Sequence, residues 1–424
     1  MCYHKRISPP QVGRAAPRAS SCWGVRAGAE LDWPHPCLLW RCGWVSFAPT
    51  GPMCDYRTMS DGVEWADVGE RLRAARLAAG LTQEELGTKA GLDRTMIVKI
   101  ESGNRRIDAI ELIRLSSALD VPVDFLLRPT PVVLSRRTSI MAEDAGTEVE
   151  KESGRLDLAL VAWLHDVQQM VELGVLQPES PLKAETVVDS EAAARDLALW
   201  AREQLGVGIE PIDSLAEFCE RAGQYVLVTN VPGEGSSVVD GDVAVAVVSL
   251  RGDPGRRRAT AAHELGHLVI GDEYSSDLGV HASRGAREAL LDAFAAELLL
   301  PSRVLTEERG SIEAISRDQL ISLAARYRTS WSLAIRQATQ AGVLSGQARR
   351  DWARCSPTRS EFMEAVGWAP QPDLEAVRVP PHYAHAVIAA WRKGAITATR
   401  AVELMHGQIT AADLPADIEA DVEP

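Results

Sequence analysis

Apolar residues between positions 68 and 127 recur at every third or fourth place, which predicts a succession of short amphipathic helices. Turn residues separate these helices at Gly91, Gly103 and Pro122. We therefore expect an all-α domain over residues 66–128.

Residues 129–154 show no helical or strand period. The segment holds Pro129 and Pro131, a basic run that starts at Arg136, and an acidic run. Prolines and unpatterned charges are typical of a linker. We predict that this linker joins the helical domain to a second domain.

The second domain, over residues 155–345, mixes helical and strand patterns. Helical spacing recurs over 156–175, 190–205, 213–222, 257–270, 285–300, 315–327 and 331–342. Runs rich in β-branched residues cover 225–229 and 243–250, so we expect an α+β fold with a small sheet. The run Val243–Leu250 fits either an edge strand that binds an extended peptide or a buried strand. Residues 346–424 are expected to be helical with an acidic, disordered tail.

Composition changes the picture at the N-terminus. Residues 1–60 hold five of the seven cysteines, four tryptophans before Met53, and no regular period. We expect this segment to be disordered or to precede a true translation start at Met53 or Met59. A metal-binding or redox tail is the alternative, although no paired C-x-x-C spacing is present.

Hydropathy and charge argue against two classes of protein: one that spans a membrane and one whose whole surface binds a polyanion. No stretch approaches the roughly 18 consecutive apolar residues that a membrane-spanning helix needs, so we expect a soluble, cytoplasmic protein without a membrane partner. The net charge of −14 argues against a surface that binds a polyanion everywhere. Any contact with DNA must therefore be local.

The stretch His263-Glu-Leu-Gly-His267 carries the candidate chemistry. On a helix, His263 and His267 project from one face and can share a tetrahedral metal, while Glu264 reaches a metal-bound water. Two imidazoles with a nearby carboxylate suit zinc, which lowers the pKa of bound water to about 7. Glu264 can then act as the base for attack on a peptide carbonyl. A chance match of this short pattern on a surface helix is the alternative.

A catalytic zinc normally takes three protein ligands. Position 273 is Glu273, which excludes the arrangement with a third histidine six residues past His267. The helix predicted over 285–300 presents Glu288 and Asp292 on one face. We assign Glu288 to the metal and Asp292 to a hydrogen bond with a histidine N–H, which turns the other ring nitrogen toward zinc.

Further polar groups are weaker candidates and are expected to be ordinary surface groups. They are Tyr274, His281, Tyr327, His382, His385 and Glu297. The first three could stabilise an oxyanion, but solvated side chains explain them better. The histidines at 382 and 385 follow two prolines that suit the start of a surface helix, and Glu297 falls off the ligand face of its helix.

Residues 257–267 and 288–301 together resemble the ImmA/IrrE family of zinc peptidases, and the likeness covers roughly 190–345. Family members carry bulky apolar residues where this chain has Ala259 and Ala261, which alters packing but not the ligands. The resemblance implies a zincin-like (gluzincin-type) domain with a thermolysin-like zinc site. It also implies a helix-turn-helix repressor as substrate, and derepression of stress or mobile-element genes after cleavage.

Residues 83–103 resemble the helix-turn-helix of the XRE or phage-repressor family. Gly91 takes the turn, and Leu92, Ile97 and Ile100 pack the second helix onto the first. The candidate DNA contacts are Gln83, Arg94, Thr95, Lys99, Arg105 and Arg106. The resemblance implies double-stranded operator DNA as partner, with a homodimer reading two half-sites. A protein-binding helical domain is the alternative, because its acidic and basic residues balance.

Two functions fit these observations. In the first, a zinc endopeptidase cuts a repressor-like protein, and its helix-turn-helix domain either recruits it to the operator or is itself the substrate through the 128–154 segment. In the second, the chain is a non-proteolytic regulator with structural zinc or a ligand-sensing pocket. An intact Glu264 favours the enzyme, because a structural zinc site needs no base. The antitoxin-like half of a two-gene module is a third possibility.

Overall fold

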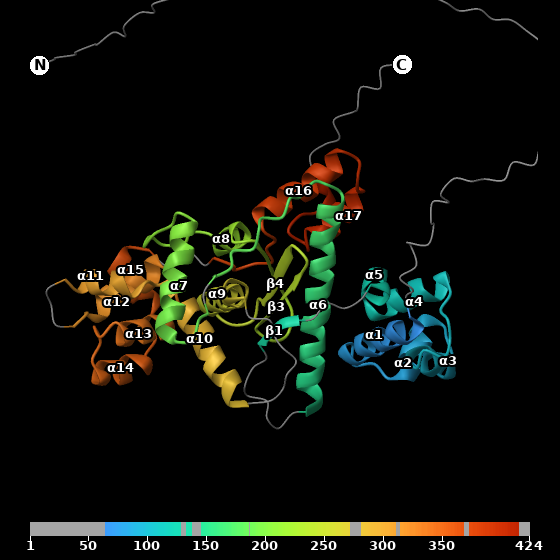
Figure 1. Ribbon diagram of the computed structural model, residues 1–424, viewed down its shortest axis with the longest axis horizontal. Helices are drawn as coiled ribbons and strands as arrows, with labels where there is room; N and C mark the ends of the chain where they lie inside the picture. Colours follow the sequence, from blue (N-terminus) through green and yellow to red (C-terminus); the bar gives the residue numbers. More distant parts are fainter. Residues whose placement is uncertain are drawn as a thin grey trace, which may run out of the picture. The chain divides into compact units, whose positions relative to one another are not determined.

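The protein is described by a computed structural model over residues 64–128, 133–137, 146–185, 187–271, 281–310, 314–368 and 373–414. The expected order is confirmed: an all-α domain comes first, and an α+β domain and a helical C-terminal region follow (Figure 1). The segment 1–60, with both suggested start codons, lies outside the described residues. Among the described helices, none is long and apolar enough to cross a membrane.

Five short helices build the first domain, as the apolar spacing predicts. They are α1 (Trp65–Ala78), α2 (Gln83–Ala90), α3 (Arg94–Glu101), α4 (Ala109–Leu119) and α5 (Val123–Leu127). Thr82 and Glu85 cap α2 reciprocally, and Gly91 ends it with φ +68°, a left-handed conformation that favours glycine. Ile97 and Ile100 of α3 are buried against the other helices, which leaves the opposite face of α3 in solvent.

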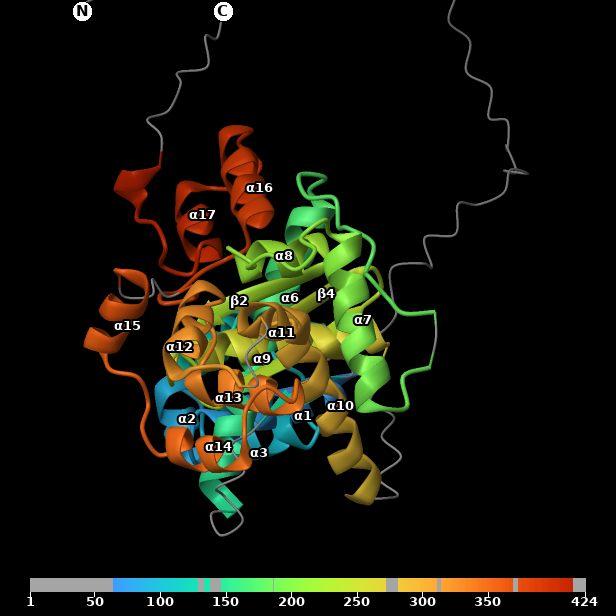
Figure 2. The same cartoon turned by 90° about the vertical axis from the view of Figure 1, so that its left-hand side faces the viewer.

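The helices of the remaining chain surround a sheet. They are α6 (Gly146–Glu172), α7 (Glu191–Gln204), α8 (Leu215–Arg221), α9 (Pro254–Ile270), α10 (His281–Leu299), α11 (Ser302–Arg309), α12 (Arg317–Arg326), α13 (Trp331–Gln340), α14 (Gly346–Ala353), α15 (Arg359–Val366), α16 (Pro381–Arg392) and α17 (Ala398–Leu404), with a 3₁₀ turn at Ala411–Asp413. In both views α10 lies beside α7 (Figures 1 and 2).

The sheet has four strands in the order β1-β3-β4-β2 within the described residues. They are β1 (Val133–Arg137), β2 (Gln224–Thr229), β3 (Gly235–Asp240) and β4 (Val243–Ser249). β2 runs parallel to β4, while β3 is antiparallel to both β4 and β1. All seven residues of β4 are buried, so the run Val243–Leu250 forms a central strand rather than an edge.

Strand alternation divides the core into two layers. Val243, Val245 and Val247 of β4 pack in the cluster that contains residues of α6 and α16. The intervening Ala244 and Ala246 pack in the cluster that contains residues of α9 and α10. Figure 1 shows α6 and α9 on opposite sides of the sheet. Small alanines on the α9 side let this helix approach the sheet closely, because they occupy little volume.

The segment 129–154 differs from the linker that we expected. It contains β1, and α6 already begins at Gly146. The sequence around β1 shows no strand period. Its strand geometry depends on pairing with β3, whose residues lie about a hundred positions further along the chain. Such long-range pairing overrides a local pattern.

The C-terminal region is built into the α+β domain. Tyr383 and Val387 of α16 and Leu404 of α17 are buried in the same cluster as Trp163 of α6. Arg378 forms an isolated bridge with Val228 on the outer side of β2. Helices α16 and α17 therefore complete the core on the α6 side of the sheet, whereas α14 and α15 pack on α13 and α12, and all four lie beyond the boundary that the sequence predicts at residue 345.

Candidate metal centre

Helix α9 presents the two histidines of the candidate site. Asp253 caps its N-terminus by accepting a hydrogen bond from Arg256 N, and Gly271 ends the helix with φ +71°. His263 and His267 lie four residues apart, so their imidazoles leave the same face with ring centroids 5.2 Å apart. Both side chains are buried, with 1% and 3% of their surface exposed.

Helix α10 brings two carboxylates to these histidines. Ligand atoms of His263, His267 and Glu288 all lie within 4.8 Å of one another. The Nε2 atom of His263 is 3.3 Å from Glu288 Oε2. Its Nδ1 atom is 3.1 Å from Asp292 Oδ1. Asp292 therefore engages the nitrogen of His263 that points away from Glu288.

The donor set fits a catalytic zinc ion. Two imidazole nitrogens and one carboxylate oxygen are ligands that zinc prefers, and three protein ligands leave one position for water or substrate. A carboxylate on the second nitrogen of a ligating histidine fixes its tautomer and orientation, and Asp292 stands at that place.

Glu264 lies next to the histidines and is fully buried. Ser237 of β3 donates a hydrogen bond from Oγ to Glu264 Oε2 at 2.7 Å. Gln224 donates to the backbone carbonyl of Glu264 at 3.0 Å. The Ser237 bond holds the carboxylate against β3, and the Gln224 bond holds the backbone of α9 at the same place, on the face of the sheet that α9 covers. Sequence analysis missed Ser237, because a Gly- and Ser-rich stretch before β4 shows no strand pattern.

Two glycines allow the close packing that the site needs. A Cβ atom at Gly235 of β3 would lie 2.5 Å from Thr260 Cγ2 and 3.2 Å from Glu264 Oε1. A Cβ atom at Gly266 would lie 3.1 Å from side-chain atoms of both Leu291 and Phe294. Glycine at these positions lets β3 approach Glu264 and lets α10 approach α9.

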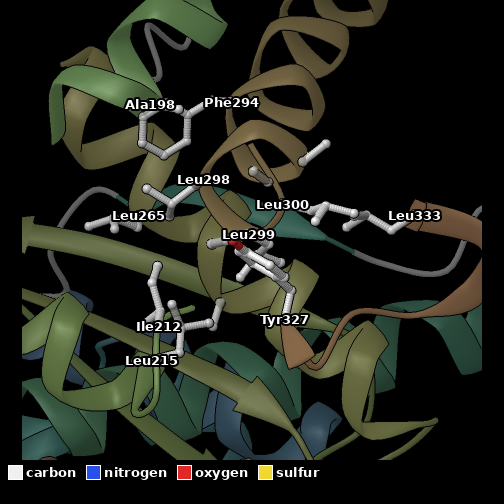
Figure 3. Close-up of a cluster of buried hydrophobic side chains, with 14 of the residues drawn as sticks. Ala198, Ile212, Leu215, Leu265, Phe294, Leu298, Leu299, Leu300, Tyr327 and Leu333 are labelled. Atoms are coloured by element: carbon white, nitrogen blue, oxygen red, sulfur yellow. The ribbon is translucent and has the colours of Figure 1, made fainter. Parts of the chain in front are cut away.

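Apolar packing fixes the two metal-site helices against their neighbours. Leu265 of α9 faces Phe294 and Leu298 of α10, and Ala198 of α7 lies against the same cluster (Figure 3). All four side chains are buried. Well-packed cores resist displacement of the elements that form them. This cluster therefore keeps α9, which carries the histidines, in a fixed position relative to α10, which carries Glu288.

The predicted DNA contacts divide into exposed and engaged side chains. Arg94, Thr95 and Lys99 on α3, and Arg106 after it, are exposed. Gln83 is half-buried and donates to Glu101 Oε2 at 2.8 Å. Arg105 makes two 2.7 Å hydrogen bonds to the carboxylate of Glu111, which raises the pKa of Arg105.

Comparisons with known proteins identify both domains. Residues 72–126 match the family model of a helix-turn-helix, and residues 219–338 match that of an IrrE N-terminal-like domain, a peptidase family. The chain joins a helix-turn-helix domain to an IrrE-like peptidase domain. His263, Glu264, His267, Glu288 and Asp292 all lie within the residues 219–338 that match the IrrE-like family model.

Curated relatives resemble only a short part of the chain. The chain is 39% identical over 64 residues to an uncharacterized HTH-type transcriptional regulator of Sinorhizobium medicae (strain WSM419) and equally to one of Rhizobium meliloti (strain 1021); each match covers 15% of this chain and 46% of the relative. It is 42% identical over 60 residues to an uncharacterized transcriptional regulator in the ATPase CF(0) region of Rhodospirillum rubrum, covering 14% of this chain and 56% of the relative. The chain spans about half the length of these relatives.

One solved structure is also similar. The restriction-modification controller protein C.AhdI from Aeromonas hydrophila is 37% identical, and the match covers 15% of this chain and 94% of that protein with a TM-score of 0.15.

Asp292→Asn is expected to weaken zinc binding by the IrrE-like domain about 10- to 100-fold, because an amide supports the ligating tautomer of His263 less well than a carboxylate. Competition with a chelating dye measures the zinc affinity. Asp351→Asn on α14, where the carboxylate bonds to Gln347, is the matched control and should leave the affinity unchanged. If Asp292→Asn and the unmodified chain bound zinc with equal affinity, Asp292 would have no role in zinc binding.

Glu297 is not the surface carboxylate that the sequence predicts. It is 1% exposed, and its Oε1 atom accepts hydrogen bonds from the backbone N (2.8 Å) and Oγ (2.7 Å) of Ser302. Gln337 and Arg195 donate to Oε2 at 2.9 and 3.3 Å. The helix breaks at Pro301, and the chain turns back toward α10. Glu297 therefore caps the start of α11, and contacts with other elements bury its carboxylate.

The remaining candidates are not part of the group formed by His263, His267 and Glu288, or they lie outside the described residues. Tyr327 was expected to be solvated, but it is 3% exposed and donates from Oη to Ile209 O at 2.8 Å. Burial raises the pKa of Tyr327. His382 and His385 are exposed at the start of α16, as predicted. The side chain of His281 and all of Tyr274 lie outside the described residues.

Proposed function

We propose that the chain is a zinc-dependent endopeptidase tethered to a DNA-binding domain, and that it cleaves a repressor-like protein to derepress stress or mobile-element genes. The observation that carries the proposal is the convergence of His263, His267 and Glu288 beside the buried carboxylate of Glu264. A structural metal site has no use for such a carboxylate, whereas peptide hydrolysis requires a base there.

Each residue of the site has a distinct role in this proposal. Zinc held by His263, His267 and Glu288 would supply a Lewis acid that polarises the peptide carbonyl. Glu264 takes a proton from the attacking water and passes it to the leaving amine. Ser237 orients the Glu264 carboxylate through its 2.7 Å hydrogen bond. The balance of the step is one water added across one peptide bond.

A cleft of about 1040 Å³ offers space for substrate side chains. Its lining includes Thr260 of α9, Asp292 and Ala295 of α10, and Trp331 and Arg336 of α13. The cleft thus reaches the carboxylate that engages His263. A wall that combines alanine, threonine and tryptophan with several arginines suits a peptide with both apolar and polar side chains.

Zinc-loaded protein incubated with a diverse peptide library tests the peptidase. New peptide termini, read by mass spectrometry, are expected with zinc and are expected to disappear with a chelator and to return when zinc is restored. The same incubation with a helix-turn-helix repressor encoded beside this chain identifies the proposed substrate. Bound zinc without any new terminus would instead favour a non-proteolytic regulator.

We further propose that the exposed face of α3 contacts operator DNA. Arg94, Thr95 and Lys99 lie on that face, and such residues in a helix-turn-helix reach bases and phosphates. Ile110 and Ile113 on α4 are 63% and 58% exposed, three residues apart on one face. That apolar pair suits contact with a second copy of the chain, because an exposed apolar patch commonly marks an interface.

Lys99→Ala is expected to weaken DNA binding similarly for all sequences and to reduce the slope of log affinity against log salt concentration by about one, if Lys99 neutralises one phosphate. Mobility-shift titrations at several salt concentrations measure this slope. Arg303→Ala on α11 of the peptidase domain, an exposed residue paired with Glu307, is the control. An unchanged affinity and slope for Lys99→Ala would argue for a protein-binding role of this domain.

A further inference from the structure

The edge of the sheet nearest to the candidate base is occupied by a segment from between the two domains. β3 carries Ser237, which donates to Glu264, and Gly235, where an added Cβ atom would lie 3.2 Å from Glu264 Oε1. The strand order places β1 on the outer side of β3. β1 precedes α6 and follows the last helix of the DNA-binding domain, so it is not contributed by the part of the chain that matches the IrrE-like domain.

The register sets β1 directly alongside the residues that contact Glu264. Ser135 is the ladder partner of Ser237, and Arg137 is the partner of Gly235. Partners in a ladder occupy the same face of a sheet, so positions 135 and 137 share the face that α9 covers. β1 and α9 accordingly have Cα atoms within 8 Å of each other. An extended chain in this place runs past the candidate base.

An extended peptide docks on a sheet edge through main-chain hydrogen bonds, which tolerate many sequences. The inner side of β3 pairs with β4 along its whole length, so only its outer side could accept such a peptide. The other edge of the sheet is β2, on the far side of β4 from β3. The outer side of β3 is therefore the edge of the sheet that lies next to Glu264.

We propose that the outer edge of β3 is the docking edge for the extended peptide substrate, and that residues 133–137 are a resident occupant that this substrate must displace. The inference rests on the proposed peptidase function and adds regulation to it. The intact chain then holds its own catalytic site at low activity. Because the occupant connects the two domains, events at the DNA-binding domain can be transmitted to the peptidase through this segment.

The pairing of β1 with β3 is short, which suits an occupant that can leave. Only four residue pairs are in register, and the register shifts between Val133 and Ser135. A shift of this kind interrupts the ladder and reduces the number of regular hydrogen bonds. A longer substrate strand without such a shift would form more ladder bonds and compete with β1.

Binding of a labelled peptide with the sequence of residues 131–139 tests the occupancy without any turnover. The host is the full chain with Glu264→Gln, and fluorescence anisotropy gives the dissociation constant. Adding Ser135→Pro and Arg136→Pro is expected to increase the affinity for the peptide at least about tenfold. Adjacent residues of a strand direct their N–H groups to opposite sides, so two prolines remove one donor that faces β3.

The matched control carries Ser135→Ala and Arg136→Ala, which keep both N–H groups. Its affinity for the peptide is expected to stay within about twofold of that of the parent. Zinc content and thermal unfolding of the three proteins report whether the prolines disturb the domain itself. Equal affinity of the proline variant, the alanine variant and the parent would overturn the proposal.

A reversible lock provides a second test if the proline variant does not fold. Val133 and Val238 are ladder partners, and paired positions in a sheet lie within the Cα distance that a disulfide spans. With Val133→Cys and Val238→Cys, oxidation is expected to abolish peptide binding, and reduction to restore it to the parent level. Peptide binding that is the same in both redox states, with the parent treated identically, would overturn the proposal.

The two proposals fail in different ways. Peptide binding that rises on loss of β1, without zinc-dependent cleavage of any library peptide, would keep the docking edge and reject the peptidase. Zinc-dependent cleavage with peptide binding that does not respond to β1 would keep the peptidase and reject the occupant. Cleavage of the unmodified chain within residues 133–137 would support the occupant, because it places this segment at the catalytic residues.

Discussion

Glu264→Gln is expected to slow peptide cleavage by about 10³-fold while the chain still binds zinc and folds normally. The amide has nearly the same shape as the carboxylate and can still accept the Ser237 hydrogen bond, but it cannot take a proton from water. Glu264 is fully buried, so bulk water cannot replace the lost base. A factor of 10³ corresponds to about 4 kcal/mol of transition-state stabilisation.

The rate with a peptide identified from the library, measured at saturating zinc, gives this factor. Glu307→Gln on α11 serves as the matched control, because its carboxylate pairs with Arg303 away from the metal centre. That variant should cleave the peptide at the rate of the unmodified chain. A Glu264→Gln protein that retained most of the activity would require a different base and would contradict the assignment.

Arg258→Met is expected to lower the free energy of unfolding of the α+β domain by about 3–5 kcal/mol, because it breaks a buried ion pair and leaves the buried Asp373 carboxylate with only the more exposed Arg378, 3.4 Å away, as a charged partner. Arg258 is 1% exposed; it bonds to Asp373 and donates to Ile212 O at 2.9 Å. Burial lowers the pKa of Arg258, and Asp373 opposes this effect. Asp373 also accepts a hydrogen bond from Leu215 N at 2.9 Å. The pair joins α9 and α8 to the C-terminal region.

Denaturant unfolding of the full chain, followed by probes in the α+β domain, measures the loss. The double variant Arg258→Met/Asp373→Leu removes both charges and is expected to be more stable than Arg258→Met alone, because the buried carboxylate that only the more exposed Arg378 would neutralise is removed as well. A loss below about 1 kcal/mol for Arg258→Met would show that the C-terminal region does not depend on this contact.

The metal motif was predictable from the sequence because it is local. His263, Glu264 and His267 lie within five residues of one helix, whose start and stop signals at Asp253 and Gly271 are plain. Glu288 and Asp292 followed from helical spacing on a second long helix. In each case the chemistry depends on residues that one regular element brings together.

Features that depend on partners far along the chain could not be predicted. β3 has a polar first half, and its strand geometry depends on pairing with β4 and on burial of Ser237 against Glu264. β1 has no period of its own. Glu297 looked solvated because helical spacing places it off the ligand face, but α11 and α13 cover it with donors. These contacts form only in the folded domain.

The zinc stoichiometry and affinity of the full chain, measured by calorimetric titration, test the central claim most directly. We expect one tight zinc per chain for the unmodified protein, with binding lost in His263→Ala and His267→Ala and severely weakened in Glu288→Gln. Glu307→Gln should bind zinc as the unmodified chain does. Zinc binding that survives in all three ligand variants would contradict the metal centre and the peptidase that rests on it.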